Sequence, residues 1–174
     1  MLVNTFCAAV NGLEVTTVKV EVSMTRGVQF HLTGLADTAV RESYDRIRAA
    51  LQNNGLKMPM MDITANLSPA DIKKEGSGYD LPLAIGILAA SGKVDGSRLN
   101  DYMMVGELGL DGRLQPIRGA LPIAIRARAE HFKGLIVPKQ NIREAAVVNQ
   151  IEVYGMETLI DVANFFNGSS EIAP

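Results

Sequence analysis

The chain has 174 residues, which fits one domain that can bury a core without metals or disulfides. Its formal net charge of −2 gives no global electrostatic case for nucleic-acid binding, although a local basic face is compatible with it. One cysteine excludes an internal disulfide, and no apolar run reaches the ~18 residues that a membrane-spanning helix needs. We therefore expect a soluble, cytoplasmic protein without a membrane partner.

The first part of the chain has the pattern of β-strands. Strands are predicted at 3–10, 15–23 and 28–32, and the second run alternates Val18, Val20 and Val22 on one face. Asn11-Gly12 separates the first two runs, and Asn-Gly between such runs is a strong hairpin signal.

A helix is predicted next, with Asp37 as its N-cap and an end at residues 53–55. Apolar residues four, three and four positions apart run from Val40 to Leu51 and predict its buried face. The other face carries charges of both signs, which is typical of a face exposed to solvent. These charged residues are Arg41, Glu42, Asp45, Arg46 and Arg48.

The middle of the chain combines a buried strand at 61–67 with a charged, glycine-rich loop at 73–79. The loop leads into an apolar helix over 80–90, and a short strand is predicted at 102–105. Residues 106–114 alternate glycine with apolar residues around Asp111-Gly112, which predicts a second hairpin.

The last third alternates helix and strand, as βαβ units do. Helices are expected at 119–130, 142–149 and 158–166, and strands at 135–137 and 151–154. We find no internal repeat and no linker before residue 167. The sequence therefore predicts a single domain over 1–167, followed by a disordered tail or the start of a linker at 168–174.

Several site classes lack their motifs. No stretch matches the phosphate-binding GxxxxGK[ST] loop, and Gly76 and Gly78 do not continue into a dinucleotide fingerprint. His31 and His131 are isolated, and neither HExxH nor CxxC occurs. We therefore expect no metal and no cofactor in this domain.

The glycine-rich loop leaves two interpretations of Ser77 open. As a nucleophile, Ser77 or Ser68 would need a base such as Lys73 or Lys74 within hydrogen-bond reach. As a structural residue, Ser77 is a small side chain that suits a turn between two glycines.

Basic residues in this part of the chain offer a different function. Lys73 and Lys74, with Arg113 and Arg118, are candidates for contacts with DNA phosphates or with an acidic partner surface. Asp80 is expected at the start of its helix, where a carboxylate satisfies free N–H groups. Glu107 and Asp111 are expected to hold the hairpin, and Gly76 and Gly78 to shape the loop.

Four stretches carry a resemblance to a known family. They are Leu32–Asp37, Ala65–Asp71, Lys74–Ala84 and Gly106–Arg113. On these motifs the chain resembles the N-terminal domain of the YifB/ComM family of magnesium chelatase-like AAA+ ATPases, over essentially its whole length.

The resemblance implies a longer parent protein. In that family the domain precedes a P-loop ATPase module that binds ATP and Mg²⁺, so we expect this chain to be a fragment. It also implies a hexameric ring motor, with DNA branch migration during natural transformation as the activity of ComM.

The chain is also similar, more distantly, to the Lon proteolytic domain and to the C-terminal domain of RadA. This similarity implies an α/β (α+β) fold of βαβ units on a mixed sheet with an N-terminal hairpin. It places Tyr79 at or near the position of the Lon nucleophile and Ile123 at the position of its lysine. An isoleucine cannot take a proton, so the resemblance implies a protease fold without protease chemistry.

We therefore expect a non-catalytic assembly or DNA-binding module, with no catalytic residues. The alternative is an ATP-dependent peptidase domain of the Ser-Lys type.

Overall fold

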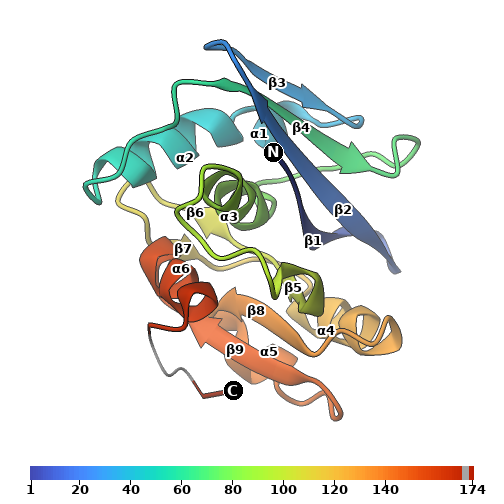
Figure 1. The fold of residues 1–174 in the computed structure, drawn as a ribbon. Coiled ribbons are helices and arrows are strands. Elements are labelled where there is room, and N and C mark those ends of the chain that lie inside the picture. Colours follow the sequence, from blue (N-terminus) through green and yellow to red (C-terminus); the bar gives the residue numbers. More distant parts are fainter. Residues whose placement is uncertain (170–172) are drawn as a thin grey trace.

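A computed structural model of the chain describes residues 1–169 and 173–174. Seven strands form one mixed sheet in the order β3-β4-β2-β1-β5-β8-β9, and β6 and β7 form a separate hairpin (Figure 1). The pairs β1/β2 and β2/β4 are antiparallel, whereas β3/β4, β1/β5, β5/β8 and β8/β9 are parallel. The α/β fold with a mixed sheet is as the sequence predicted.

The strands have the following bounds: β1 Leu2–Asn11, β2 Glu14–Thr25, β3 Phe30–Thr33, β4 Asp62–Ser68, β5 Tyr102–Met104, β6 Glu107–Leu108, β7 Leu114–Gln115, β8 Gly134–Pro138 and β9 Glu152–Met156. The helices are α1 Thr38–Arg41, α2 Ser43–Gln52, α3 Asp80–Ala90, α4 Ala120–Ala129, α5 Ile142–Ala145 and α6 Leu159–Asn167, with short 3₁₀ turns at Leu99–Asp101 and Lys139–Asn141.

Both predicted hairpins are present. Asn11 of β1 pairs with Glu14 of β2 across the Asn11-Gly12 turn, where Gly12 has a φ of 65°. Glu107 of β6 pairs with Gln115 of β7, and Gly112 has a φ of 88° in the turn between them. Glycine tolerates positive φ at low cost, which explains why Asn-Gly and Asp-Gly are good turn signals.

The helices cover both faces of the sheet. Neighbouring residues of a strand point to opposite faces. On β2, Val22 lies against Gly86 of α3, whereas Thr17 accepts a hydrogen bond from Arg126 of α4 at 3.3 Å. Because residues 17 and 22 differ by an odd number, α3 and α4 lie on opposite faces.

Helix α3 is the centre of the core. Every residue from Asp80 to Ala90 is buried, and the helix contacts β1, β2, α2 and α6 (Figure 1). Thr5 of β1 also donates a hydrogen bond to the Pro82 carbonyl at 2.9 Å. A helix that is apolar on all sides is stable only when it is surrounded in this way.

The helix predicted from Asp37 is divided into α1 and α2 at Glu42. Asp37 caps α1 by accepting a hydrogen bond from the Val40 amide at 2.9 Å. The Ala39 carbonyl accepts a hydrogen bond from the Arg46 guanidinium at 2.6 Å, so the chain bends where this side chain enters. Helix α5 also differs from the prediction. It ends at Ala145, before the predicted end at 149, and part of the predicted tail, residues 170–172, lies outside the described residues.

Among the helices of the described residues, none has the length and apolar character required to cross a membrane.

The close packing of α3 on β2 predicts an unusual response to Gly86→Ala. Replacing glycine by alanine in a helix normally adds ~0.5–1 kcal/mol of stability. Here the new Cβ would lie 2.8 Å from Val22 Cγ2. We expect this overpacking to reduce the free energy of unfolding by ~1–3 kcal/mol in chemical denaturation.

Gly96→Ala is the matched control, because its new Cβ would meet Leu99 at an ordinary 3.6 Å. Equal stabilities of the two variants would contradict the close packing of α3.

Candidate functional site

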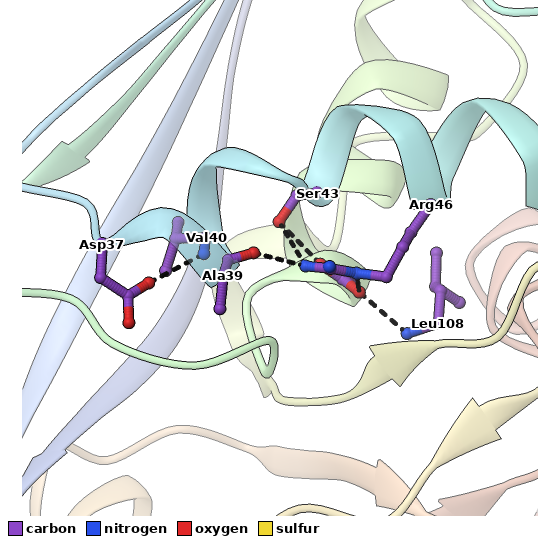
Figure 2. A network of polar contacts seen from close by, with 7 residues as sticks. Asp37, Ala39, Val40, Ser43, Arg46 and Leu108 are labelled. Atoms are coloured by element: carbon purple, nitrogen blue, oxygen red, sulfur yellow. Dashed lines mark hydrogen bonds and ion pairs between the residues drawn. The ribbon is translucent and has the colours of Figure 1, made fainter.

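A buried ion pair joins α2 to the start of α3. The Asp80 carboxylate accepts hydrogen bonds from Arg46 Nε at 2.6 Å and Arg46 Nη2 at 3.0 Å. It also accepts from Ser43 Oγ at 2.7 Å and from the Leu108 amide at 3.0 Å. Figure 2 shows Ser43, Arg46 and the Leu108 amide converging on one point. Three separate segments are therefore tied to one carboxylate.

The environment of this pair determines its electrostatics. The Asp80 side chain is fully buried, whereas that of Arg46 is 19% exposed. Burial raises the pKa of Asp80, and the hydrogen bonds from Arg46, Ser43 and Leu108 oppose that rise. The hydrogen bond to Asp80 in turn raises the pKa of Arg46. Removing either partner would leave a poorly solvated charge, which is costly.

Asp80 therefore differs from its predicted role. It is the first residue of α3, but its carboxylate binds Arg46, Ser43 and β6 and not the N–H groups of its own helix. Those amides have backbone partners: Asp80 donates to Ser77 and Leu81 donates to Gly106. The prediction for Arg46 is also wrong. Its side chain was expected on a solvent-exposed face, but it pairs with the buried carboxylate of Asp80.

A cavity of about 730 Å³ lies beside this network. Its lining comes from the glycine-rich loop, from β1 and Val105, and from the segment 116–119 with the start of α4. Its lining residues are Ala8, Val10, Asp37, Glu75, Gly76, Ser77, Gly78, Tyr79, Val105, Glu107, Pro116, Ile117, Arg118, Gly119 and Ile123. The cavity lies at the carboxyl-terminal ends of the adjacent parallel strands β1 and β5, where α/β proteins often bind ligands.

Hydrogen bonds at both ends hold the glycine-rich loop in place. The Gly76 amide donates to Asp37 Oδ2 at 3.1 Å, and the φ of Gly76 is 84°. The Gly78 carbonyl accepts from the Gly106 amide at 3.0 Å. Gly76 therefore shapes the loop through its positive φ, whereas Gly78 contributes a backbone carbonyl that anchors it.

The two positions suggested by the Lon resemblance lie in this same cavity. Tyr79 is 2% exposed and Ile123 is 3% exposed, and both are among the residues that line the cavity with Ser77. Within the described residues, Ser77 has no hydrogen bond to a lysine, and the cavity lining contains neither lysine nor histidine. The cavity therefore contains the two positions that the Lon resemblance assigns to a Ser-Lys dyad. Their residue types, tyrosine and isoleucine, are not those that such a dyad needs.

Lys74 is a correction to the predicted binding residues. It is completely buried and its ammonium donates to the Pro69 carbonyl, so it cannot reach a DNA phosphate in this structure. Burial lowers its pKa. Its backbone forms a bridge to Ala36, which explains why this position points inward.

The other predicted cations are exposed but separate. Lys73 pairs with Glu75 at 3.3 Å, and Arg113 lies 3.7 Å from Asp111 on the hairpin. Arg118 lies at the cavity. The structure therefore does not gather the predicted set into one patch.

The two hairpin carboxylates have different surroundings. Asp111 accepts a hydrogen bond from the Arg113 amide at 3.0 Å within the turn. Glu107 lines the cavity, so it has a position from which it can contact a ligand.

No group of three or more histidine, cysteine, aspartate or glutamate residues is placed to hold a metal ion in the described part of the chain.

Sequence comparison provides the family. The family model described as "Subunit ChlI of Mg-chelatase" matches residues 20–141. The chain belongs to this family. The matched segment includes the glycine-rich loop, α3, the second hairpin and most of the cavity lining.

Individual relatives agree with this assignment. Competence protein ComM of Haemophilus influenzae is 43% identical over 162 residues, which cover 92% of this chain and 32% of that protein. Uncharacterized protein YifB of Escherichia coli is 41% identical over 139 residues, covering 79% of this chain and 27% of that protein. The resemblance to YifB and ComM is therefore confirmed, and the chain spans about a third of the length of the curated relatives it matches.

The similarity to Lon is weaker. Lon protease 2 of Bacillus subtilis is 27% identical over 179 residues, covering 88% of this chain and 32% of that protein.

The ion pair predicts a large effect of Asp80→Asn. The change removes the charge that balances Arg46 while leaving the shape nearly unchanged. We expect the free energy of unfolding to fall by ~3–5 kcal/mol, as when one partner of a buried pair is removed. The free energy of unfolding is measured by urea denaturation, with circular dichroism as the signal.

Asp45→Asn makes the same chemical change at an exposed position of α2 and should shift stability by less than ~0.5 kcal/mol. If both variants unfolded at the same urea concentration, the ion pair would not have the structural role assigned to it.

Proposed function

We propose that this chain is a non-catalytic assembly and DNA-binding module of a hexameric magnesium chelatase-like AAA+ ATPase. The parent protein would be a DNA branch-migration helicase of the ComM kind, acting in natural transformation. The name of the Haemophilus influenzae relative, a competence protein, supports this direction.

One observation carries the non-catalytic part of the proposal. Tyr79 and Ile123 occupy the cavity positions where the Lon resemblance places a nucleophile and a base. Burial raises the pKa of Tyr79, which disfavours the phenolate that a nucleophile would need. Isoleucine has no titratable group. The cavity is therefore better suited to binding than to proton transfer.

The DNA or subunit contact is assigned to the exposed cations Lys73, Arg113 and Arg118. Arg118 lines the cavity, Lys73 is in the glycine-rich loop beside it, and Arg113 is on the second hairpin; lysine and arginine side chains both bind phosphate groups. The overall charge of −2 disfavours strong DNA binding by a single copy of the domain. The proposed contact is therefore one in which several copies in a ring bind the same DNA together.

ATP and Mg²⁺ belong, in this proposal, to a separate ATPase module of the longer protein. The absence of a P-loop motif from the sequence supports placing ATP and Mg²⁺ in that separate module. We therefore assign no step of ATP hydrolysis to this domain.

A Ser-Lys peptidase is the alternative, and the Lon protease 2 match together with Ser77 in the cavity favours it. Against it, Lys73 is engaged by Glu75 and Lys74 is buried against Pro69. The alternative would require one of these lysines to move into the cavity.

Fluorescence anisotropy with single-stranded and branched DNA across a salt series tests the proposal, with light scattering on the same sample. We expect binding that weakens steeply with salt, because phosphate contacts release counterions. Absence of both DNA binding and self-association would contradict the proposed role.

Replacing Lys73, Arg113 and Arg118 by alanine together should weaken binding. The slope of log affinity against log salt should decrease by ~0.9 for each phosphate that the variant no longer neutralises. The control replaces Arg48, Lys57 and Arg128 by alanine, which changes the net charge equally at other exposed positions. Equal weakening in both variants would indicate a general charge effect and not binding by the proposed residues.

A further inference from the structure

One edge of the main sheet is open at β3. Among the described residues this strand pairs with β4 alone, and Figure 1 shows it as the outermost strand at its end of the sheet. The Gln29 carbonyl accepts a hydrogen bond from the Ile63 amide at 2.8 Å, so the backbone groups of residues 29, 31 and 33 face β4. The N–H and C=O groups of Phe30 and Leu32 therefore point away from the sheet, and no loop or side chain of the described residues bonds to them.

The sequence of this edge lacks the features that normally protect an edge strand. Native edges are blunted by charged side chains, above all lysine, and by proline. Residues 28–34 contain no lysine, arginine, carboxylate or proline. Val28, next to the strand, is 74% exposed, and Leu35 is 54% exposed. An uncharged edge with free backbone groups is complementary to another β-strand.

The side chains of the edge divide between the two faces of the sheet. Phe30 contacts Tyr44 of α2, with ring centroids 4.8 Å apart, and Leu32 packs against the core. Both remain partly exposed, whereas His31 and Thr33, which alternate with them, are exposed. A strand added at this edge would cover the two apolar side chains further and leave the polar ones in water.

The edge is complementary to a copy of itself. When two β3 strands run antiparallel about a two-fold axis at His31, Phe30 of each copy lies opposite Leu32 of the other. These are the residues whose backbone groups point outward, so each opposing pair can exchange both of its hydrogen bonds. The register also places an aromatic side chain against an aliphatic one, which is a favourable cross-strand pair. Because residues 28–34 contain no lysine, arginine or carboxylate, none of these charges faces its own copy across the axis.

We propose that β3 pairs with β3 of a second copy of this chain, so that two seven-stranded sheets join into one. The contact is closed, because it uses the open edge of both copies and leaves neither free for a third. Neighbours within a cyclic ring meet through two different surfaces, so a two-fold contact of this kind joins domains of two separate rings. A short contact that several copies repeat gains strength through multivalency. The inference goes beyond the proposed function and does not require DNA binding.

Sedimentation velocity of the chain over a dilution series tests the pairing, and we expect a dimer that dissociates on dilution. His31→Lys places two ammonium groups opposite each other at the axis and should raise the dissociation constant by about fivefold. Thr64→Lys is the matched control, because it adds the same charge at the exposed position beside His31 on β4, one strand away from the contact. It should change the dissociation constant by less than about twofold.

Amide hydrogen exchange, followed by NMR on the ¹⁵N-labelled chain, locates the contact. We expect the amides of Phe30 and Leu32 to exchange more slowly as the protein concentration rises. A chain that stays monomeric at every concentration would overturn the proposal, as would a dimer in which these two amides exchange as fast as in the dilute monomer. Equal weakening by His31→Lys and Thr64→Lys would also overturn it.

The exchange measurement uses the unchanged chain, so the test remains decisive if the His31 variant does not fold. A monomeric chain that binds DNA would overturn the pairing of β3 and leave the proposed function intact.

Discussion

The buried ion pair between Arg46 and Asp80 is the constraint on which the rest of the site depends. Asp80 follows directly after the glycine-rich loop, and Leu108, whose amide binds the same carboxylate, follows directly after Glu107. Loop and hairpin therefore approach each other because both are tied to one charge. Arg46 also donates a hydrogen bond to the Ala39 carbonyl, which holds the bend between α1 and α2. This bend in turn sets the position of Asp37 at the start of α1. The walls of the cavity are consequences of this arrangement.

In the part of the chain that the structure describes, the lining of the cavity includes Ser77 and three carboxylates but neither lysine nor histidine. The cavity lies at the carboxyl ends of the parallel strands β1 and β5, where α/β proteins often bind ligands. A hydrolase would add a nucleophile with a base beside it, whereas Tyr79 and Ile123 are buried side chains that cannot exchange protons near neutral pH. The chain belongs to the Mg-chelatase-like family and has a weaker similarity to Lon, and a shared fold does not by itself transfer an activity.

Local signals in the sequence predicted much of the fold. Asn11-Gly12, Asp111-Gly112 and the apolar helix from Asp80 act through neighbouring residues, so their structures follow from short stretches of sequence. The roles of Arg46 and Lys74 could not be predicted in this way. Arg46 finds its partner 34 positions away, and Lys74 is buried because its backbone pairs with Ala36. For both residues a charged side chain indicated solvent, and only the tertiary arrangement shows the group that it binds. Tyr79, Arg118 and Ile123 line the same cavity although they are far apart in the sequence, so this arrangement also could not be predicted from short stretches.

The central claim is that this Lon-like domain binds without hydrolysing. The most direct measurement is the release of fluorescent peptides from labelled unfolded casein by the chain and by its Ser77→Ala variant. The account predicts no release above buffer for either protein. Hydrolysis by the unchanged chain that disappears in Ser77→Ala would contradict the account and would establish Ser77 as a nucleophile.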